Sequence, residues 1–492
     1  MDADEKVVPG DVIDGQEGSV ESLPDFDRAA ESRALRKFDI FALPQMMIVM
    51  LVAYLDRSNI AWSLSPDALW NAKVFGLVEG LHLHGNQFNN ISTVFYATYV
   101  VFEVPWVIAV KRFGANRVLA IALVCWSVVT LCTGFIHNYA QALAMRLLLG
   151  AAEAGLFPSQ AFVISTIWDR QDCAKRICLL YMAAALSGAF GGLIAYGVET
   201  MGTRLGLAAW RWLFIIEGAV SVALCSMAWF TLPRSSEQAW FLTEEENEVM
   251  RVRRARNAAY QGNTDTFKPH HIRQAFTDLQ VYLAAILQFG NTVSQFGFST
   301  FLPTLLTGFG YTSLQANYLS IPCYVVAAIS LFAWASLSDR LGKRALISFI
   351  CCLPCVLGYA IVVGTSNKAA GYFAMYMCAA GIYPYNAVLT TWVSNNIAPD
   401  YKRSAALPLF VCLANISGIV ASQIYPASDA PRYITGNATS LALESLSCCG
   451  VGLLWLLLRR RNLRKSMEQT GETGQSNTSY DDDRGPNFLY AL

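Results

Sequence analysis

The heptapeptide Ser338-Asp339-Arg340-Leu341-Gly342-Lys343-Arg344 connects two long apolar stretches, residues 318–337 and 346–363. A second basic, glycine-containing heptapeptide, KRFGANR at 111–117, connects two such stretches near the start of the chain. An apolar stretch of about 20 residues is long enough to cross a bilayer as a helix. Similar short loops between candidate spans in both parts of the chain indicate a membrane protein built from two related bundles.

Further candidate spans lie on both sides of these loops. The first group comprises residues 41–64, 91–110, 118–136, 143–164, 177–198 and 212–232, and the second comprises 281–302, 318–337, 346–363, 372–392, 405–425 and 438–458. We therefore predict an all-α integral membrane protein with twelve transmembrane helices in two six-helix bundles. The stretch between the two groups contains no span, so we expect a long middle loop there.

The composition excludes an ordinary water-soluble protein. The chain has 492 residues, of which 54% are hydrophobic and only 15% are charged, against roughly 25% charged in soluble domains. The 36 Lys and Arg residues balance the 36 Asp and Glu residues, so no basic surface for a nucleic acid is predicted. The first residues carry no removable secretory signal, and the first span is expected to act as its own insertion signal.

The positions of Lys and Arg predict the orientation. The loops after spans 2, 4, 8 and 10 are richer in these residues than the loops on the opposite side, and positive loops are retained in the cytoplasm. Both termini and the middle loop are then cytoplasmic. The predicted organisation is an acidic tail (1–37), a first bundle (38–232), the middle loop (233–276), a second bundle (277–458) and a second tail (459–492).

The loops and cysteines give no sign of a metal or cofactor. Twelve of the thirteen cysteines fall in apolar runs, without CxxC spacing or paired histidine ligands, so we interpret them as small packing residues. His82 and His84 have no carboxylate or thiol partner nearby in the sequence and are interpreted as surface residues. Thr243 and Glu246 form a capping-box pattern that predicts a helix in the middle loop. Asn437 begins a glycosylation-type triplet.

The heptapeptide after span 8 resembles the cytoplasmic signature of the major facilitator superfamily. The resemblance implies gating by pairing of charged groups between helix ends, and the candidate gating residues are Asp339, Arg340, Gly342 and Arg344 in the second half and Arg112, Gly114 and Arg117 in the first. In the first half, Lys111 stands where the family has an aspartate.

Four further stretches narrow the resemblance. They are YLDRSN at 54–59, FEVP at 102–105, RLLLGAAEAGLFP at 146–158 and WRWLFIIEG at 210–218. Together they resemble the anion:cation symporter family, and within it the fungal permease group for allantoate, nicotinate and pantothenate. The resemblance implies a monomer in the plasma membrane that moves a small organic anion with protons.

Charged residues in a membrane interior are costly and are functional candidates by default. Arg146 and Glu153 are seven residues apart, about 20° from each other on one helical face, with Gly150 between them allowing a neighbouring helix or ligand to approach. Asp56 and Arg57 point about 100° apart, so one is expected to face the substrate and the other span 4.

These charges suggest an anion site coupled to protons. The planar guanidinium of Arg57 suits a carboxylate substrate, whereas Asp56 and Glu153 suit proton carriers, with Arg146 pairing to a carboxylate in one state and releasing it in another. The resemblance supports these roles. The alternative is a fixed salt-bridge cluster between two helices, which we consider less consistent with four charges in a membrane core.

Two other sets of charges are assigned differently. Glu103, which precedes Pro105, has two equally plausible roles, a structural bond and proton transfer. Arg211 and Glu217 are expected to form a structural pair near the outer mouth of span 6.

The second half supplies neutral groups. Gln288, Asn291 and Gln295 share one helical face, which is consistent with interhelical bonding and equally with recognition of the uncharged part of a ligand. The candidate substrate-binding residues are Arg57, Tyr54, Asn291, Gln288, Asn386, Tyr383 and Asn415. In span 5, Gly188 and Gly192 predict close helix packing.

The predicted function is a proton-coupled symporter that imports a small organic anion by alternating access. Two rivals are an exporter of an acidic secondary metabolite and a non-transporting nutrient sensor. An enzyme is disfavoured because no nucleophile, metal cluster or phosphate-binding loop occurs at suitable spacing. The expected partners are the anion, protons and the lipid bilayer.

Overall fold

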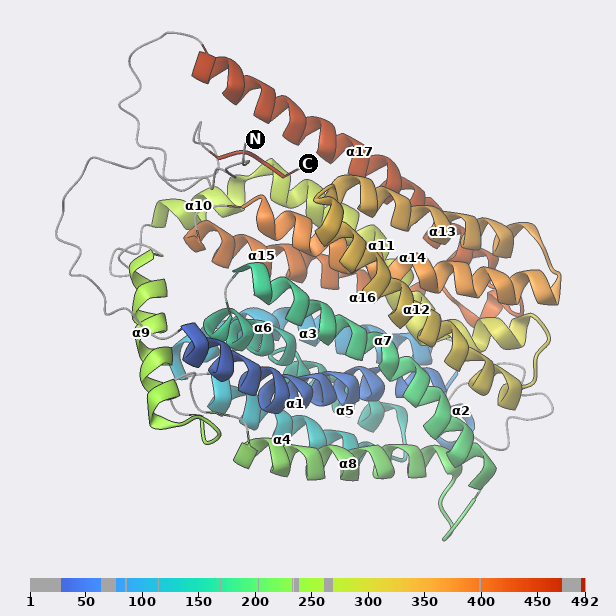
Figure 1. The fold of residues 1–492 in the computed structure, drawn as a ribbon. Helices are drawn as coiled ribbons and strands as arrows, with labels where there is room; N and C mark the ends of the chain where they lie inside the picture. Colours follow the sequence, from blue (N-terminus) through green and yellow to red (C-terminus); the bar gives the residue numbers. More distant parts are fainter. Residues whose placement is uncertain are drawn as a thin grey trace, which may run out of the picture.

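In the computed structural model the described chain is almost entirely α-helical (Figure 1). The structure describes residues 28–62, 77–84, 86–113, 115–168, 170–201, 203–231, 233, 239–260, 269–397, 400–470 and 488–491. The helices of the first half are α1 (Arg28–Trp62), α2 (Leu77–Gly80), α3 (Gln87–Phe113), α4 (Ala115–Thr133), α5 (Tyr139–Glu153), α6 (Leu156–Ile167), α7 (Arg170–Met201) and α8 (Ala209–Thr231).

The middle stretch and the second half continue this helical pattern. They contain α9 (Glu244–Tyr260), α10 (Pro269–Thr277), α11 (Leu279–Gly308), α12 (Ser313–Leu341), α13 (Arg344–Gly364), α14 (Lys368–Asn395), α15 (Asp400–Asn415), α16 (Ser417–Gln423), a 3-10 turn (Ala427–Asp429) and α17 (Ile434–Thr470). The outer two helices extend beyond the predicted bundle edges, because α1 begins at Arg28 and α17 continues to Thr470.

Six of the described helical segments are long and apolar enough to cross a membrane. They are Ala29–Arg57, Lys175–Val198, Leu314–Leu341, Arg344–Gly364, Ala406–Gln423 and Ile434–Met467. Each of the twelve apolar stretches of the sequence overlaps one described helix or two consecutive ones. The number of membrane crossings and the side on which the termini lie stay predictions.

Two of the predicted spans are each divided between two helices. α5 ends at Glu153 and α6 begins at Leu156, and α15 ends at Asn415 just before α16 begins at Ser417. Because broken helices expose main-chain groups at membrane depth, they are tolerated where protein surrounds them. Both breaks follow residues proposed for the site, Glu153 and Asn415.

The two halves form two adjacent groups of helices, α1–α8 and α11–α17 (Figure 1). Close contact between α7 and α12 depends on glycine. A Cβ atom added at Gly188 would lie 2.4 Å from the ring of Tyr324, and one added at Gly192 would lie 2.9 Å from the main-chain oxygen of Asn317. The predicted role of these two glycines in close helix packing is confirmed.

A second contact between the halves joins α3 to the helices around the α15–α16 break. Nε2 of Gln423 donates to Oγ1 of Thr93 at 2.6 Å, and a Cβ atom added at Gly418 would lie 2.2 Å from the ring of Tyr96. The halves are therefore in contact along both α7 and α3, with the region between these contacts left for the site.

The predicted capping box at the start of α9 is confirmed. The main-chain N–H of Thr243 donates to Oε2 of Glu246 at 2.9 Å, and the N–H of Glu246 donates to Oγ1 of Thr243 at 3.3 Å. The same Glu246 carboxylate accepts from Nζ of Lys37 at 2.6 Å, and Arg253 pairs with Glu31. Helix α9 is thereby attached to the first turns of α1.

The remaining loop predictions have mixed outcomes. Eleven of the thirteen cysteines have described side chains, and these eleven are free thiols, which agrees with their interpretation as packing residues. Asn437, the acceptor of the glycosylation-type triplet, is fully buried and its side chain donates to the main-chain oxygen of Arg432 at 3.2 Å. An attached glycan is therefore incompatible with this structure.

Candidate functional site

A buried ion pair joins the first helix to the broken fourth span. Nη2 of Arg57 on α1 donates to Oε1 of Glu153 at 2.5 Å, and the side chains are 9% and 1% exposed. Glu153 is the last residue of α5. Burying two charges is costly and requires that each keeps its partner, so removing either residue leaves an uncompensated charge in the interior.

Close packing of α3 against α5 places aromatic rings around this ion pair. A Cβ atom added at Gly150 would lie 2.3 Å from the main-chain oxygen of Phe95, so Gly150 is required for the approach of a neighbouring helix. The guanidinium carbon of Arg57 lies 4.6 Å from the ring centre of Tyr54, 4.8 Å from that of Tyr99 and 5.3 Å from that of Phe95. These distances allow cation–π stabilisation of the arginine.

The ion pair leaves hydrogen-bonding capacity unused. Nε of Arg57 and Oε2 of Glu153 are both buried without a hydrogen-bond partner among the described residues. Buried polar atoms normally have partners, and exceptions are frequent at functional sites. One donor and one acceptor are thus available to a ligand or a proton at the same place.

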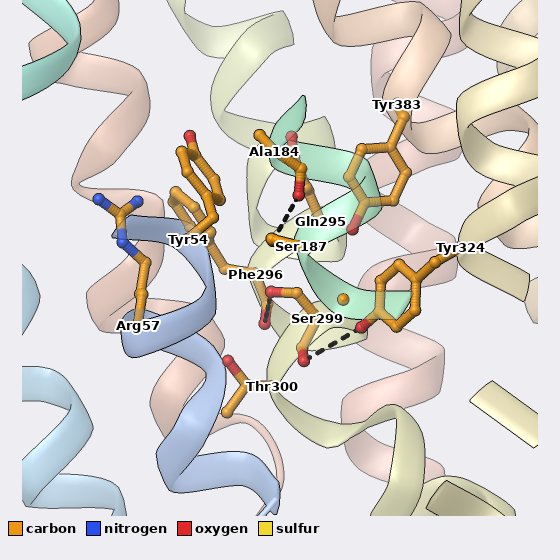
Figure 2. Close-up of a pocket in the computed structure, with 11 residues that line it drawn as sticks. Tyr54, Arg57, Ala184, Ser187, Gln295, Phe296, Ser299, Thr300, Tyr324 and Tyr383 are labelled. Carbon is orange, nitrogen blue, oxygen red and sulfur yellow. Dashed lines mark hydrogen bonds between the residues drawn. The ribbon is translucent and has the colours of Figure 1, made fainter. Parts of the chain in front are cut away.

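Arg57 also lines a small cavity between the two halves (Figure 2). Tyr54 and Arg57 from α1 lie at one side, Tyr324 and Tyr383 at the other, and the α11 segment that contains Gln295 lies between them. The full lining comprises Tyr54, Arg57, Ala184, Ser187, Gly188, Gln295, Phe296, Ser299, Thr300, Tyr324 and Tyr383. The cavity volume is about 20 Å³, room for about one water molecule.

A second buried group of charges lies next to the first, centred on Asp56. Oδ2 of Asp56 accepts from Oγ1 of Thr130 on α4 and from Oγ of Ser221 on α8, both at 3.3 Å. Its carboxyl group also lies beside that of Glu217, which precedes Ser221 by one turn. Arg57 thus contacts span 4 through Glu153 and also lines the cavity, whereas Asp56 accepts hydrogen bonds from spans 3 and 6.

Arg146 is the cation of this second group. It is 4% exposed, and its interaction partners by charge are Asp56, Glu153 and Glu217. Its Nη2 is buried without a hydrogen-bond partner among the described residues. Arg146 therefore lies between Glu153 and the Asp56–Glu217 group and is able to interact with the carboxylates of either. Neither Arg146 nor Glu153 is part of the cavity lining.

The predicted pair between Arg211 and Glu217 is wrong. Arg211 donates instead to the main-chain oxygen of Gly134 at 3.1 Å and contacts Nδ1 of His137 at 3.2 Å. Six residues correspond to 600° of helix rotation, so the two side chains point about 120° apart. Glu217 faces the interior as a result and is 3% exposed, with both carboxyl oxygens lacking hydrogen-bond donors among the described residues.

Glu103 connects the two halves of the molecule. Nδ2 of Asn415, at the end of α15, donates to Oε2 of Glu103 on α3 at 3.1 Å. Glu103 is 2% exposed. In this structure the carboxylate therefore makes a bond between the halves, and neither residue lines the cavity.

Gln288, Asn291 and Gln295, which share one face of α11, have different contacts. Gln295 lines the cavity, and its Oε1 accepts from Nδ2 of Asn386 at 2.6 Å. Asn291 donates to Oε1 of Glu444 on α17 at 3.0 Å. Gln288 is buried outside the cavity lining. Here Gln295 is positioned for ligand recognition, whereas Asn291 bonds one helix to another.

Two buried carboxylates of this arrangement were not predicted as site residues. From the sequence, Glu217 is expected in a structural pair near the outer mouth of span 6, and Glu444, which is fully buried in the last apolar stretch, is not singled out. A single acidic residue within an apolar stretch of the sequence, such as Glu444 between residues 438 and 458, is the signal that identifies such positions.

The described gating candidates of the second half form a local cluster at the end of α12. Gly342 ends this helix in the left-handed conformation (φ 65°), which a glycine adopts without steric cost. Nη2 of Arg344 donates to Oδ1 of Asp339 at 3.4 Å, and Arg340 is exposed. In the first half Arg117 is exposed. The side chain of Arg112 and the residue Gly114 lie outside the described residues.

Residues 46–422 match the model of the Major Facilitator Superfamily. The chain belongs to the Major Facilitator Superfamily. This facilitator is 41% identical over 460 residues to an uncharacterized transporter of Schizosaccharomyces pombe, with 93% of this chain and 90% of that protein covered. It is 33% identical over 475 residues to the high-affinity nicotinic acid transporter of Saccharomyces cerevisiae, covering 96% and 86% of the two chains.

Solved structures show the same facilitator fold. A bacterial homolog of the human lysosomal transporter Spinster matches with a TM-score of 0.63 at 14% identity, covering 87% of this chain and 97% of that chain. The xylose transporter XylE from E. coli matches with a TM-score of 0.62 at 13% identity, covering 83% and 98%. The protein is a multi-pass membrane transporter of the facilitator type, consistent with a function other than that of an enzyme.

Proposed function

We propose that this facilitator is a proton-coupled symporter of the anion:cation symporter family that imports a small organic anion. The observation that carries the proposal is the buried Arg57–Glu153 pair at the edge of a cavity lined by both halves. The nicotinic acid transporter among its relatives supports a carboxylate substrate. We place the protein in the fungal permease group for allantoate, nicotinate and pantothenate, and in the plasma membrane as a monomer.

Exchange of partners at Arg57 couples the anion to the proton. When Glu153 binds a proton it loses its charge, and the Arg57 guanidinium is left to bind the carboxylate of the substrate through paired N–H groups. Arrival of the anion in turn favours protonation of Glu153, because a second carboxylate next to an ionised one is repelled. Proton and anion thus bind together, and either one alone leaves the site with an unpaired charge.

The group around Asp56 provides a second proton position. Asp56 and Glu217 have adjacent carboxyl groups, and two adjacent carboxylates favour holding one proton between them. Arg146 balances this group while Arg57 is bound to Glu153. When Glu153 is protonated, Arg146 is attracted only to the Asp56 group, so the protonation of one group affects the other.

The neutral part of the substrate is recognised by the second half. Gln295, Ser299, Tyr324 and Tyr383 line the cavity, with the two tyrosines on the side opposite Arg57, and they offer amide and hydroxyl groups to a small ring or an amide. Because the cavity has room for about one water molecule, α11, α12 and α14 of the second half must separate from α1 and α7 of the first half as the anion enters. This movement is the rocking of two bundles that alternating access requires, with Asp339 and Arg344 as gating residues.

A pH recording on intact cells tests this proposal. Cells that express the protein are suspended in a lightly buffered medium, and small carboxylates are added one at a time, beginning with nicotinate. Import with protons makes the medium more alkaline for the transported compound and not for the others. Cells with the variant Arg57→Ala at equal surface density serve as the control. No alkalinisation with any compound would instead favour export of an acidic metabolite or a sensor.

A further inference from the structure

A short extended segment, Phe488–Ala491, lies against the ends of α14 and α17, and two asparagine side chains hold its main chain. Nδ2 of Asn462 donates to the oxygen of Tyr490 and the N–H of Tyr490 donates to Oδ1 of Asn462, both at 2.9 Å. Nδ2 of Asn396 donates to the oxygen of Ala491 at 3.1 Å, and the N–H of Ala491 donates to Oδ1 of Asn396 at 2.7 Å. Each asparagine carboxamide thus makes the paired N–H and C=O hydrogen bonds that a neighbouring β-strand would make to one residue of the segment.

Side-chain contacts add a preference for an aromatic residue in the middle of the segment. Tyr490 is 4% exposed and lies in a buried cluster with Trp392, whose Nε1 donates to the oxygen of Ala491 at 2.9 Å. Nζ of Lys465 lies 4.3 Å from the Tyr490 ring centre. Leu489, by contrast, is 66% exposed. The alternation of buried and exposed side chains is that of an extended peptide bound along a groove.

The groove continues into a buried polar network of the second half. The main-chain oxygen of Asn396 accepts from Nε2 of Gln280 at 3.2 Å, and Oε1 of Gln280 accepts from Nη1 of Arg461 at 3.1 Å. Arg461 also pairs with Asp278 at 3.5 Å. The bound segment is therefore attached to residues that join the start of α11 to the ends of α14 and α17.

We propose that the ends of α14 and α17 form a peptide-binding groove, which Phe488–Ala491 occupies in cis and from which it is able to detach. The groove recognises an extended segment with one buried aromatic residue, through main-chain bonds to Asn396 and Asn462. Such recognition of a strand by main-chain hydrogen bonds and one pocket is a known mode of peptide binding. Detachment uncovers Trp392 and the two asparagines for the same segment of a second copy of this chain.

Peptide binding to full-length variants in detergent tests the groove. The probe is a fluorescein-labelled peptide with the sequence of residues 485–492, measured by anisotropy. Wild-type protein is expected to bind it weakly, since the cis segment competes at a high effective concentration. Tyr490→Ala removes this competition and is expected to increase the affinity for the added peptide by at least about ten-fold.

Two matched variants complete the binding experiment. Tyr490→Ala combined with Asn396→Ala and Asn462→Ala is expected to lose the gain in peptide affinity. Leu489→Ala, at the exposed position beside Tyr490, is expected to bind like the wild type. Equal peptide binding by the wild type, the Tyr490→Ala protein and the triple variant would overturn the proposal.

Hydrogen exchange on the unmodified chain gives a readout that does not depend on a variant's folding. The amides of Tyr490 and Ala491 are expected to exchange at least about ten times more slowly than in the free peptide, because each donates to an asparagine oxygen. Addition of excess unlabelled peptide is expected to increase their exchange by displacing the segment. Exchange of both amides at the free-peptide rate in the wild type would contradict a bound segment.

Discussion

The two halves of the transporter contribute different chemistry to one cavity. In the first half Arg57 lines the cavity, and the buried residues Asp56, Arg146, Glu153 and Glu217 belong to the two groups of charges described beside it. The second half lines it with uncharged groups, among them Gln295, Tyr324 and Tyr383. The buried carboxylate Glu444 of the second half lies away from the cavity and bonds to Asn291.

From this difference we infer separate tasks for the two halves. The charges that exchange partners in the proposed mechanism are on α1, α5 and α8, so in that mechanism binding and release of protons alter the electrostatic forces within the first half. Neutral groups keep the same charge in every state, and the second half is therefore suited to fit the shape and polar groups of the substrate. Substitutions in the first half should affect coupling, and those in the second half should affect affinity.

Replacement of the anchor is expected to give the largest effect. Arg57→Ala removes the anion's partner and leaves Glu153 buried without a cation, so we expect uptake of the substrate to fall by at least about 100-fold. Arg57→Lys keeps the charge but loses the planar pair of donors and should have intermediate uptake. Initial rates of labelled anion uptake measure both variants.

The control for this prediction is Arg251→Ala, which removes an exposed arginine on α9 that pairs with Glu248. Exposed pairs contribute little to stability, so uptake should be unchanged. Normal uptake by the Arg57→Ala protein at equal surface density would assign the anchor to another residue.

A buried ion pair of the second half is expected to affect stability. Nζ of Lys402 donates to Oδ2 of Asp278 at 2.5 Å, and both side chains are buried. Asp278→Asn leaves Lys402 without its carboxylate and should destabilise the protein by roughly 3–5 kcal/mol, seen as a lower melting temperature in detergent. If the melting temperature were unchanged, the pair would not stabilise the start of α11.

The same pair predicts how stability depends on pH. Burial acts to raise the pKa of Asp278, but Lys402, the N–H of Gln280 and Arg461 outweigh it and hold the pKa below its ordinary value. The carboxylate therefore stabilises the fold above a pH of about 4, its pKa in the unfolded chain, and this contribution is lost as the pH falls through the lower native pKa. In the Asp278→Asn variant the melting temperature should therefore depend less on pH in that acidic range than it does in the wild type.

Removal of a neutral cavity group is expected to give a smaller, different effect. Gln295→Ala removes one amide from the cavity and the acceptor of Asn386, and should raise the KM for the anion by about 3–10-fold. The accumulation ratio driven by a proton gradient should remain that of the wild type. A loss of accumulation with an unchanged KM would contradict the separation of tasks between the halves.

The smallest effect is expected for the carboxylate of the second half. Glu444→Gln removes a charge but keeps an oxygen for the amide of Asn291, so proton-driven uptake should change by less than about two-fold. Glu217→Gln is the matched variant in the first half and should impair accumulation. Similar losses in both variants would mean that proton coupling involves the second half as well.

The positions of the apolar helices and the residues of the main ion pair were predictable from the sequence, because apolar length and rare charges within apolar stretches are local signals. Arg57 and Glu153 stand out in this way. The partners of each charge were not predictable, since they depend on how helices rotate against one another. A common position near the outer mouth of span 6 suggests a pair between Arg211 and Glu217, but helix geometry directs them to different faces.

Contacts between residues far apart in the sequence could also not be predicted from local sequence patterns. The bond of Glu103 to Asn415 joins residues 312 positions apart, and the groove for Phe488–Ala491 brings together residues of α14 and α17. In contrast, Gly188, Gly192 and the capping box of α9 were predicted, because small side chains and N-cap spacing act within one helix.

In the proposed mechanism Glu153 carries the proton that makes Arg57 available to the anion. The most direct test of this role is uptake into proteoliposomes that contain wild-type or Glu153→Gln protein, under an imposed pH gradient and under anion exchange without a gradient. The neutral glutamine mimics the protonated carboxyl group, so the account predicts loss of uphill accumulation with anion exchange retained. Gradient-driven accumulation by the Glu153→Gln protein at the wild-type level would contradict it.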